Sequence, residues 1–415
     1  MSREIPVFFS RLIGNILKRL MKPSSNSLHL IKKINRVKLL NLLRQKSPLS
    51  RTQLAIFSHL DNKTITNIIG ELLKESLVKP IGFQDSSGGR RGELLDINED
   101  YAHIIGIDLG ASHILGVLVN LKAKIIKKEK LEILPRKEGK NKIIKKVLKL
   151  CHNLLKAESP DKQIKGIGFV LPGILDREKG ISKFSVNLMA WEKVPIKKIL
   201  EKEFSLPVFL EESSRAMALA ENWFGAGRNV DNFISLDLGI GIGMGIILGG
   251  KLYYGKTESA GEIGHTTVEE KGRRCHCGKY GCLETIASGL AIAQEAREQT
   301  HLNPPPITAQ TVADAAKNND KFSLEILAKA GKNLGIAVSN IINLFNPELL
   351  IIGGGLANSG KPLLVPMKEA IKKYALPTLV QPTRIVVSKL GEESAALGAA
   401  TLFLKEIFEL EETKQ

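Results

Sequence analysis

The sequence lacks any uninterrupted apolar stretch of about 20 residues, the length that a helix needs to cross a bilayer. The short apolar run at 7–9 is broken by Arg11, and no small-residue cleavage site follows it. We therefore expect neither a membrane-spanning helix nor a secretory signal peptide. Residues 1–27 are expected to be a poorly ordered leader. An amphipathic helix, or a true start at Met21, are the alternatives.

Cysteine is also scarce, with four in 415 residues. Cys275, Cys277 and Cys282 fall within eight residues, whereas Cys151 stands alone in a lysine-rich helical stretch and is expected to be an ordinary buried thiol. This distribution does not suit a disulfide framework. It indicates a reduced, cytoplasmic environment and a metal site.

Positive charge, in contrast, is in excess, with a formal net charge of +17. Residues 1–98 hold 17 Lys and Arg against 7 Asp and Glu, an excess of ten, and the rest of the chain holds 43 against 36, an excess of seven. Concentrated basic charge attracts phosphates and releases counterions on binding, so the first quarter of the chain is a candidate for nucleic-acid binding. A generally lysine-rich proteome would leave the same pattern.

Residues 28–98 have the order of elements of a winged helix-turn-helix. Residues 29–46 predict a helix that Ser47-Pro48 ends, and its apolar face is expected at Leu30, Ile34, Val37 and Leu40. Ser50 is a plausible N-cap for a short second helix, and Asp61 for a third. The third helix should bury Ile65, Ile68, Ile69 and Leu72.

After the third helix, residues 77–98 predict a strand, a turn at Gly88-Gly89 and a second strand, which is a β-hairpin wing with two cations at its tip. A polar helix face can contact base edges of DNA, and a wing with cations at its tip can contact the phosphates. A helical bundle used for dimerisation is the alternative. The predicted DNA-contacting residues are Arg51, Thr52, Asn62, Lys63, Thr64, Thr66, Asn67, Arg90 and Arg91.

A repeat occupies the rest of the chain. Residues 105–118 (IGIDLGASHILGVL) and 234–247 (ISLDLGIGIGMGII) both lead from an apolar strand through Asp-Leu-Gly into another strand. A third glycine-rich turn follows the strand in LLIIGGGLA. Two related α/β lobes facing a cleft are therefore expected, with turns that let backbone N–H groups approach a phosphate. The predicted nucleotide-type loop residues are Asp108, Gly110, Gly239, Gly241, Gly353 and Gly354.

The spacing His265-x9-Cys275-x-Cys277-x4-Cys282 predicts a metal site. One imidazole and three thiolates form a ligand set for tetrahedral zinc, and four protein ligands leave no open position, so the zinc would be structural. His276 is a competing ligand.

Taken together, the chain resembles the ROK family (repressors, open reading frames and kinases), in its N-acetylglucosamine- and xylose-repressor branch. The resemblance covers nearly everything after residue 28 and is carried by SRTQLA, GGRRGELLDIN, GIDLGAS, PGILD, NLMAW, LGIGIGMGII, GEIGH with its cysteine block, and ESAALGAA. It implies an actin-like sugar-kinase fold, a zinc within the sugar-binding domain, and homodimers or larger assemblies. The sugar contacts that the resemblance implies are Asn187, Glu262, His265 and Glu284.

Two positions depart from the family's kinases. Their catalytic Asn-Asp pair follows the strand that reads LPVFL here, and this chain has Glu212 and Ser213 instead. A serine hydroxyl cannot act as the general base near neutral pH, and loss of a positioned base typically lowers a rate ~10²–10⁴-fold. Glu212 is expected to point to the opposite side, as in a continuing strand. Ile240 replaces a threonine usual in the phosphate loop. We expect no useful kinase activity and little or no ATP binding.

The predicted organisation is a leader (1–27), a winged helix-turn-helix (28–98) and a ROK domain (103–410), with lobes at about 103–220 and 230–410 and a zinc-binding insert at 265–282. The predicted function is a transcriptional repressor of carbohydrate metabolism that binds pseudo-palindromic DNA and a sugar or sugar phosphate. Two alternatives stay open. One is an active sugar kinase with an accessory DNA-binding head. The other is a DNA-bound scaffold that recruits a phosphotransferase-system protein.

Overall fold

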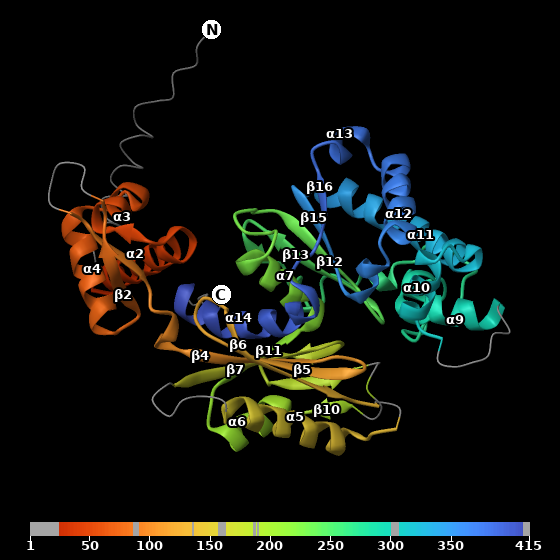
Figure 1. The fold of residues 1–415 in the computed structure, drawn as a ribbon, viewed down its shortest axis with the longest axis horizontal. Coiled ribbons are helices and arrows are strands. Elements are labelled where there is room, and N and C mark those ends of the chain that lie inside the picture. Colours follow the sequence, from red (N-terminus) through yellow and green to blue (C-terminus); the bar gives the residue numbers. More distant parts are fainter. Residues whose placement is uncertain are drawn as a thin grey trace, which may run out of the picture. The chain divides into compact units, whose positions relative to one another are not determined.

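The computed structural model describes residues 25–85, 91–134, 137–156, 163–185, 188, 191–299 and 307–409 (Figure 1). They form two compact units. The first unit comprises the described part of residues 1–101 with residues 405–409, and the second comprises residues 102–404. No helix within these residues combines the length and the apolar composition that crossing a membrane requires.

The first unit combines helices with a small antiparallel sheet of strand order β1-β3-β2. The predicted caps are confirmed: the Ser50 side chain accepts from the Gln53 N–H, and the Asp61 side chain accepts from the Thr64 N–H. The predicted strands are present, although the Gly88-Gly89 turn lies outside the described residues. The elements are α2 (Ser25–Lys46), β1 (Leu49–Ser50), α3 (Arg51–Ser58), α4 (Asn62–Lys74), β2 (Val78–Phe83), β3 (Glu93–Ile97) and η1 (Glu99–Tyr101).

The apolar face of α4 is buried as predicted, at Ile65, Ile68, Ile69 and Leu72. The prediction for α2 is wrong over its first half, where Leu30 and Ile34 are exposed. The reason is that Lys32 and Arg36 face α4 there and form ion pairs with Glu71 and Glu75. The buried apolar face of α2 begins only after these cations, at Leu39, Leu40 and Leu43.

The second unit contains two five-stranded sheets, which define lobe I and lobe II. Lobe I has the order β11-β7-β4-β5-β6, from β4 (His103–Leu109), β5 (His113–Val119), β6 (Ile125–Glu132), β7 (Ile164–Leu171) and β11 (Val208–Glu212). Lobe II has the order β14-β13-β12-β15-β16, from β12 (Phe233–Leu238), β13 (Ile242–Leu248), β14 (Lys251–Leu252), β15 (Leu349–Gly353) and β16 (Arg384–Val387).

The two sheets have equivalent pairings. In each, the strand that ends in Asp-Leu pairs antiparallel with the next strand and parallel with a later one, β4 with β5 and β7, and β12 with β13 and β15. The repeat seen in the sequence is therefore a repeat of topology. It places Asp108 and Asp237 at equivalent strand ends.

Helices cover the outer face of each sheet (Figure 1). Lobe I is covered by α5 (Lys140–Leu155), in which Cys151 is buried as predicted, and by α6 (Ile196–Phe204). Its core also packs against a small sheet of β8 (Ile174–Asp176), β9 (Ile181–Phe184) and β10 (Glu192–Val194). Lobe II carries η2 (Ile263–His265), α8 (Glu284–Ala287), α9 (Gly289–Gln299), α10 (Ala309–Lys317), α11 (Lys321–Phe345), η3 (Gly355–Ser359), α12 (Lys361–Tyr374) and α13 (Pro377–Val380).

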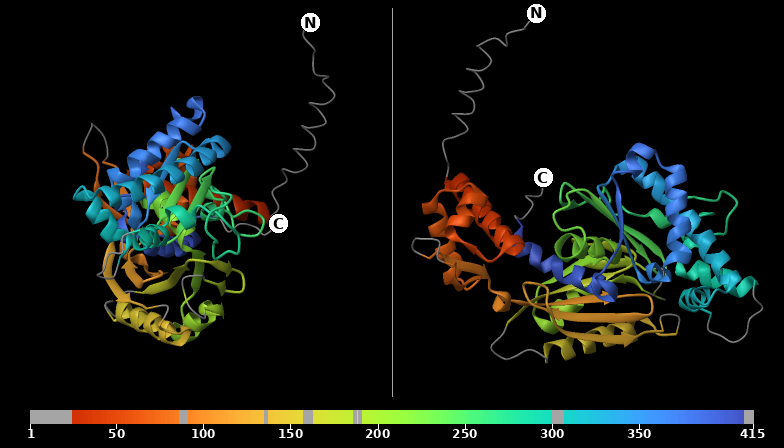
Figure 2. Two further views of the ribbon diagram at one scale, coloured as in Figure 1. Left: turned by 90° about the vertical axis from the view of Figure 1, so that its right-hand side faces the viewer. Right: turned by 45° about the horizontal axis from the view of Figure 1, so that its top comes forward.

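The inner faces are covered by α7 (Ser213–Phe224) and, after η4 (Gly391–Glu393), by α14 (Ser394–Phe408), which runs along the lobe I sheet in Figure 1 and in the right-hand view of Figure 2. Glycines allow this close packing. A Cβ on Gly168 of β7 would lie 1.8 Å from the Ala399 carbonyl oxygen of α14, and one on Gly243 of β13 would lie 2.0 Å from Ser214 Oγ of α7. The first residues of α7 are thereby held between the two Asp-Leu-Gly turns.

Candidate functional site

Helix α4 presents a polar face at its N-terminal end. Asn62, Lys63 and Asn67 are exposed, and their amide and ammonium groups can reach another molecule. The two threonine hydroxyls donate locally instead, Thr64 Oγ1 to Asp61 Oδ2 at 2.6 Å and Thr66 Oγ1 to the Asn62 carbonyl at 2.8 Å. Of the five α4 residues predicted to contact DNA, the two asparagines and the lysine are therefore better placed to do so.

The other residues predicted to contact DNA differ in their surroundings. Thr52 and Arg91 are exposed. Arg51 forms an ion pair with Glu93 at 2.7 Å, which joins α3 to β3, so its guanidinium already has a protein partner. Arg90 lies outside the described residues.

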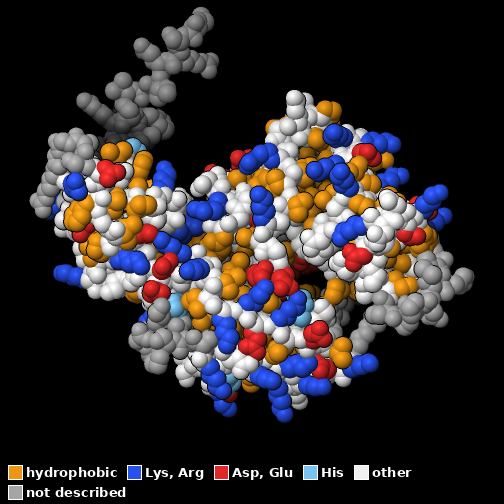
Figure 3. Space-filling view, viewed as in Figure 1, with side chains coloured by type: hydrophobic (Ala, Val, Ile, Leu, Met, Phe, Trp, Pro, Cys, Tyr) orange, Lys and Arg blue, Asp and Glu red, His pale blue; other side chains and the backbone are white. Residues whose placement is uncertain are grey.

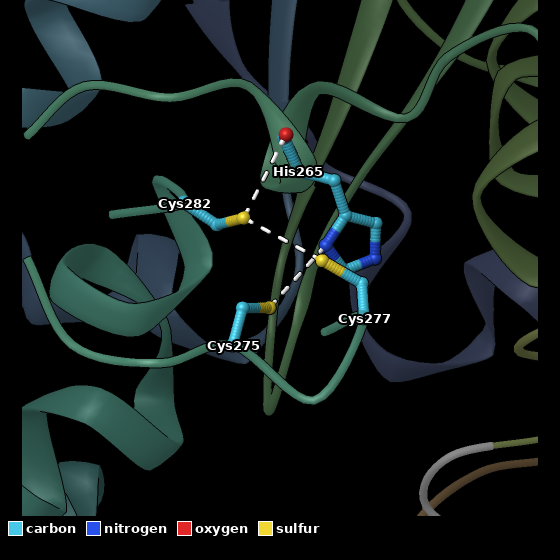
Figure 4. Close-up of side chains that lie close together, drawn as sticks. All are labelled: His265, Cys275, Cys277 and Cys282. Carbon is cyan, nitrogen blue, oxygen red and sulfur yellow. Dashed lines mark hydrogen bonds between the residues drawn. The ribbon is translucent and has the colours of Figure 1, made fainter. Parts of the chain in front are cut away.

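A cluster of one histidine and three cysteines lies in the segment that follows β14 (Figure 4). Cys275 Sγ is 3.6 Å from His265 Nδ1, and Cys277 Sγ is 3.6 Å from Cys282 Sγ. All four candidate ligand atoms lie within 4.8 Å of one another. Zinc at the centre of a tetrahedron, with bonds of about 2.3 Å to sulfur and 2.0 Å to nitrogen, needs S···S and S···N separations of about 3.8 and 3.5 Å. The residues present therefore fit that metal.

A second ligand set shares two members of this cluster. His265, Cys275, His276 and Glu284 also bring their ligand atoms within 4.8 Å of one another. His276 Nδ1 is 3.9 Å from Cys275 Sγ and 3.4 Å from Glu284 Oε1. The set with three sulfurs has the donor chemistry that zinc prefers, whereas the second set uses Glu284, which already accepts a backbone hydrogen bond.

A cleft of about 1410 Å³ separates the lobes and is lined by both Asp-Leu-Gly turns. The face of the molecule in Figure 3 is hollowed between the lobes. Asp108 and Asp237 are each the next-to-last residue of their strand, β4 and β12, so the repeat places one carboxylate from each lobe in the cleft. The predicted loop residues Gly110, Gly239, Gly241, Gly353 and Gly354 all line this cleft.

The first two residues of α7 meet these carboxylates. Ser213 Oγ donates to Asp108 Oδ1, and Ser214 Oγ donates to Asp237 Oδ2, each at 3.4 Å. We did not expect the second contact from the sequence. The adjacent Ser-Ser pair and the two repeated aspartates were the available indication of it.

The prediction that Glu212 points away from the cleft is wrong. Strand β11 ends at Glu212 and helix α7 begins at Ser213, so strand alternation does not continue across this point. The Glu212 carboxylate instead caps α7, accepting from the N–H groups of Ser214 and Arg215 at 2.9 and 3.1 Å, and it lines the cleft.

Three carboxyl groups of the cleft have a raised pKa. Burial, followed by the negative charge of Asp237, raises the pKa of Asp108 to about 7. Burial also raises the pKa of Glu212 to about 7 and that of Asp237 to about 6. A part of this cleft therefore changes its charge near neutral pH.

The residues predicted to contact sugar lie in lobe II, except Asn187, which is outside the described residues. Glu262, His265 and Glu284 all line the cleft. His265 Nε2 is 3.9 Å from Glu262 Oε2, while His265 Nδ1 faces Cys275, so the two ring nitrogens point to different partners. The structure thus brings the metal cluster and these acids together.

Glu284 also holds the second glycine-rich turn. Its Oε2 accepts from the Ile242 N–H at 2.9 Å, and a Cβ on Gly241 would lie 2.6 Å from the same oxygen. Gly241 therefore leaves room for a protein carboxylate, a role that we did not predict. Gly354, with φ of 81°, similarly lets Asp237 approach, since a Cβ there would lie 2.6 Å from Asp237 Oδ1.

Comparison with known proteins connects these features. Residues 104–406 match the ROK family. A xylose repressor of Caldicellulosiruptor bescii is 34% identical over 92% of this chain and 98% of its own length. A glucokinase of Thermotoga maritima is 36% identical over 73% of this chain and 98% of its own length. A solved structure of a ROK family transcriptional regulator, homologous to the E. coli MLC protein, superposes with a TM-score of 0.78 at 29% identity and covers 91% of this chain and 96% of its own.

Proposed function

The chain belongs to the ROK family, and on this premise we propose that it is a DNA-binding transcriptional repressor of carbohydrate metabolism whose kinase-like domain has lost catalysis. Its second unit has the ROK sugar-kinase fold. The observation that carries the proposal is that a helical unit with a polar helix face precedes a cleft lined by Ser213, the residue that the resemblance aligns with the catalytic base of the family's kinases.

The first unit acts as a winged helix-turn-helix. Helix α4 is the recognition helix, and β2 and β3 form the wing. Asn62, Lys63 and Asn67 read base edges in the major groove, while Arg90 and Arg91 contact phosphates. Two such units of a homodimer would meet the half-sites of a pseudo-palindromic operator.

The cleft of the second unit binds a sugar without phosphorylating it. The Ser213 hydroxyl donates to Asp108 and has no basicity to accept a proton from an attacking sugar hydroxyl. Ile240 adds no hydroxyl for phosphate contact. Glu262, His265, Glu284 and Asn187 supply the hydrogen-bonding groups that a sugar requires.

His265, Cys275, Cys277 and Cys282 would hold a structural zinc. Bound there, zinc would crosslink the segment between Glu262 and Glu284 and so fix the spacing of two sugar contacts. Sugar occupancy would then change the relative position of the lobes and, through it, operator affinity.

A DNA-binding measurement tests the proposal. Purified protein should shift DNA from its own promoter region, with an affinity that falls steeply as salt rises. Asn62→Ala with Asn67→Ala should weaken specific binding by about 1–3 kcal/mol per lost base contact and leave nonspecific binding nearly unchanged. Gln294→Ala, which removes an exposed amide of the second unit, is the matched control. Equal specific binding by the double variant and the control would contradict the assignment of α4.

An active sugar kinase is the second candidate, and the likeness to a glucokinase, together with the retained Glu262 and Glu284, favours it. A coupled ADP-release assay across hexoses and amino sugars separates the two. We expect no turnover above background. Rates of about 1 s⁻¹ or more, abolished by Glu212→Gln, would make Glu212 the base and would overturn the proposed loss of catalysis.

A further inference from the structure

A partly buried group of charged residues joins the two lobes at one side of the cleft. Arg177 follows β8 in lobe I, and Tyr254 and Glu258 lie in the loop that follows β14 in lobe II. This loop continues directly into residues 259–262, which line the cleft and end in the proposed sugar contact Glu262. The chain next to Arg177, at 172–174, lines the cleft from the lobe I side.

Arg177 makes several contacts to the lobe II loop. Its Nη2 donates to the Tyr254 hydroxyl at 3.2 Å, and its guanidinium carbon lies 4.1 Å from the centre of the Tyr254 ring. Its Nη1 donates to Glu258 Oε1 at 3.3 Å. A planar guanidinium can stack on a ring and donate at its edges at the same time, which a lysine ammonium cannot do.

On the lobe I side, Arg177 rests on Glu211, which is completely buried. Glu211 is itself held in place, because its Oε1 accepts from Arg215 Nε at 2.8 Å and from the Glu212 N–H at 2.9 Å. Glu211 therefore gives Arg177 a fixed point of attachment. That point is one residue from Glu212 and two from Ser213, both of which line the cleft.

The contact between Arg177 and Glu211 is incomplete. Arg177 Nε and Glu211 Oε2 are 3.3 Å apart and both buried, yet no hydrogen bond of acceptable angle joins them, and the Glu211 carboxylate also faces the Tyr254 hydroxyl. Glu258 also has a φ of 56°, in the left-handed region that a non-glycine residue rarely adopts without support. The guanidinium is thus held between Glu211 of lobe I and two residues of the lobe II loop, so a shift of that loop would change its orientation on Glu211.

We propose that Arg177 is a positioning residue that fastens the loop 253–262 of lobe II onto lobe I and so sets the position of Glu262 in the cleft. Because its partners lie in both lobes, a movement of the lobes around a sugar would change the contacts of Arg177 with Tyr254 and Glu258. This inference rests on the proposed sugar binding for its purpose, but the fastening itself is a property of the protein without ligand.

Hydrogen–deuterium exchange of the full-length protein without sugar tests the fastening. Arg177→Ala should increase exchange about tenfold or more in residues 253–262 while the strands β12 and β13 keep their protection. Arg177→Lys should give an intermediate increase, because lysine keeps the positive charge but lacks the planar guanidinium with its several N–H donors. Lys128→Ala is the matched control, since Lys128 pairs with Glu392 and Glu393 of the same unit but does not contact this loop.

The melting temperature and the affinity for sugar complete the test. A residue of merely structural importance would lower the melting temperature and raise exchange everywhere, whereas we expect a local change and a sugar affinity weakened about tenfold. Unchanged exchange at 253–262 in Arg177→Ala would overturn the inference. Wild-type protein that binds none of the tested sugars, while Arg177→Ala still loosens the loop, would count against the proposed function and leave the fastening standing.

Discussion

Lobe I and lobe II have equivalent sheets and an equivalent Asp-Leu-Gly turn, yet the two turns are held differently. Each turn closes on itself, as the Gly110 N–H donates to the His113 carbonyl in lobe I and the Gly239 N–H donates to the Gly241 carbonyl in lobe II, each at 3.0 Å, but lobe II has further ties. In lobe II, Glu284 accepts from the Ile242 N–H, and the first N–H groups of α9, from Gly289 and Leu290, donate to the carbonyls of Gly239 and Ile240. The second turn is thus tied to residues more than forty positions later in the chain.

The extra hydrogen bonds of lobe II show which part of the repeated framework carries additional structure. The extra ties of lobe II all come from the segment that carries the His-Cys cluster and from the helices after it. In lobe I, the Glu212-Ser213 pair that differs from the family's kinases lies where β11 ends and α7 begins, and Ser213 donates there to Asp108. Under the proposed function, lobe II supplies the supported binding surface, and lobe I is where the catalytic base has been lost.

The largest effect is expected from a substitution in the His-Cys cluster, which has no counterpart among the described residues of lobe I. Cys282→Ala should abolish tight zinc binding and lower the free energy of unfolding by about 4 kcal/mol or more, as loss of a metal site typically does. Zinc content by atomic emission and thermal unfolding measure this. Cys151→Ala, in the buried core of lobe I, should keep its zinc. Equal zinc content in both variants would refute the ligand assignment.

A second comparison sets Asp108 against Asp237. Because burial raises the pKa of both, the folded protein holds protons that the unfolded chain has released, so stability should fall as pH rises from about 4 to about 7 and level off above that. Asp108, with a pKa of about 7, should contribute more than Asp237, with one of about 6. The effect of Asp108 is on the order of 4 kcal/mol at most.

Melting temperatures across this pH range check the prediction. Asp108→Asn should flatten the profile more than Asp237→Asn does. The same slope in both variants and in the wild type would mean that these carboxyls do not titrate in the expected range.

Substitutions at the two Asp-Leu-Gly turns should have smaller effects on stability, and these effects should differ between the lobes. Glu284→Ala leaves the Ile242 N–H without its acceptor and should lower the free energy of unfolding by about 1–3 kcal/mol, whereas Glu284→Gln keeps an amide oxygen there and should lower it less. Ser112→Ala in the lobe I turn, where the hydroxyl contacts only His113 Nδ1, should change it by less than about 0.5 kcal/mol. Chemical denaturation measures all three, and an Ala variant no weaker than the Gln variant would show that the turn does not depend on this bond.

The smallest expected effect concerns the two serines of α7. Ser213→Ala and Ser214→Ala each remove one hydroxyl whose hydrogen bond is long, at 3.4 Å. Each should therefore lower the free energy of unfolding by about 1 kcal/mol or less, which thermal unfolding measures. The two effects should be similar if the lobes are equivalent at this point. A markedly larger loss for one serine would show that its aspartate depends on it.

Local features of the sequence predicted much of this molecule. The caps at Ser50 and Asp61, the buried face of α4 and the duplicated strand–turn–strand units are each set by residues within a few positions of one another, and the structure has them as expected. The His-Cys cluster was predicted for the same reason, because its cysteines are close together in the chain. The prediction failed at α2, where helical spacing alone could not tell which of two faces meets α4.

Short-range periodicity, capping and spacing therefore predict the helices and strands, the order of the two lobes and the members of the His-Cys cluster. Three contacts depend instead on how distant segments pack: Gly241 makes room for Glu284, Ser214 meets Asp237, and Arg177 reaches Tyr254 across the lobes. These contacts join residues between 23 and 77 positions apart. No local pattern specifies such pairs, because they form only when separately folded segments pack together.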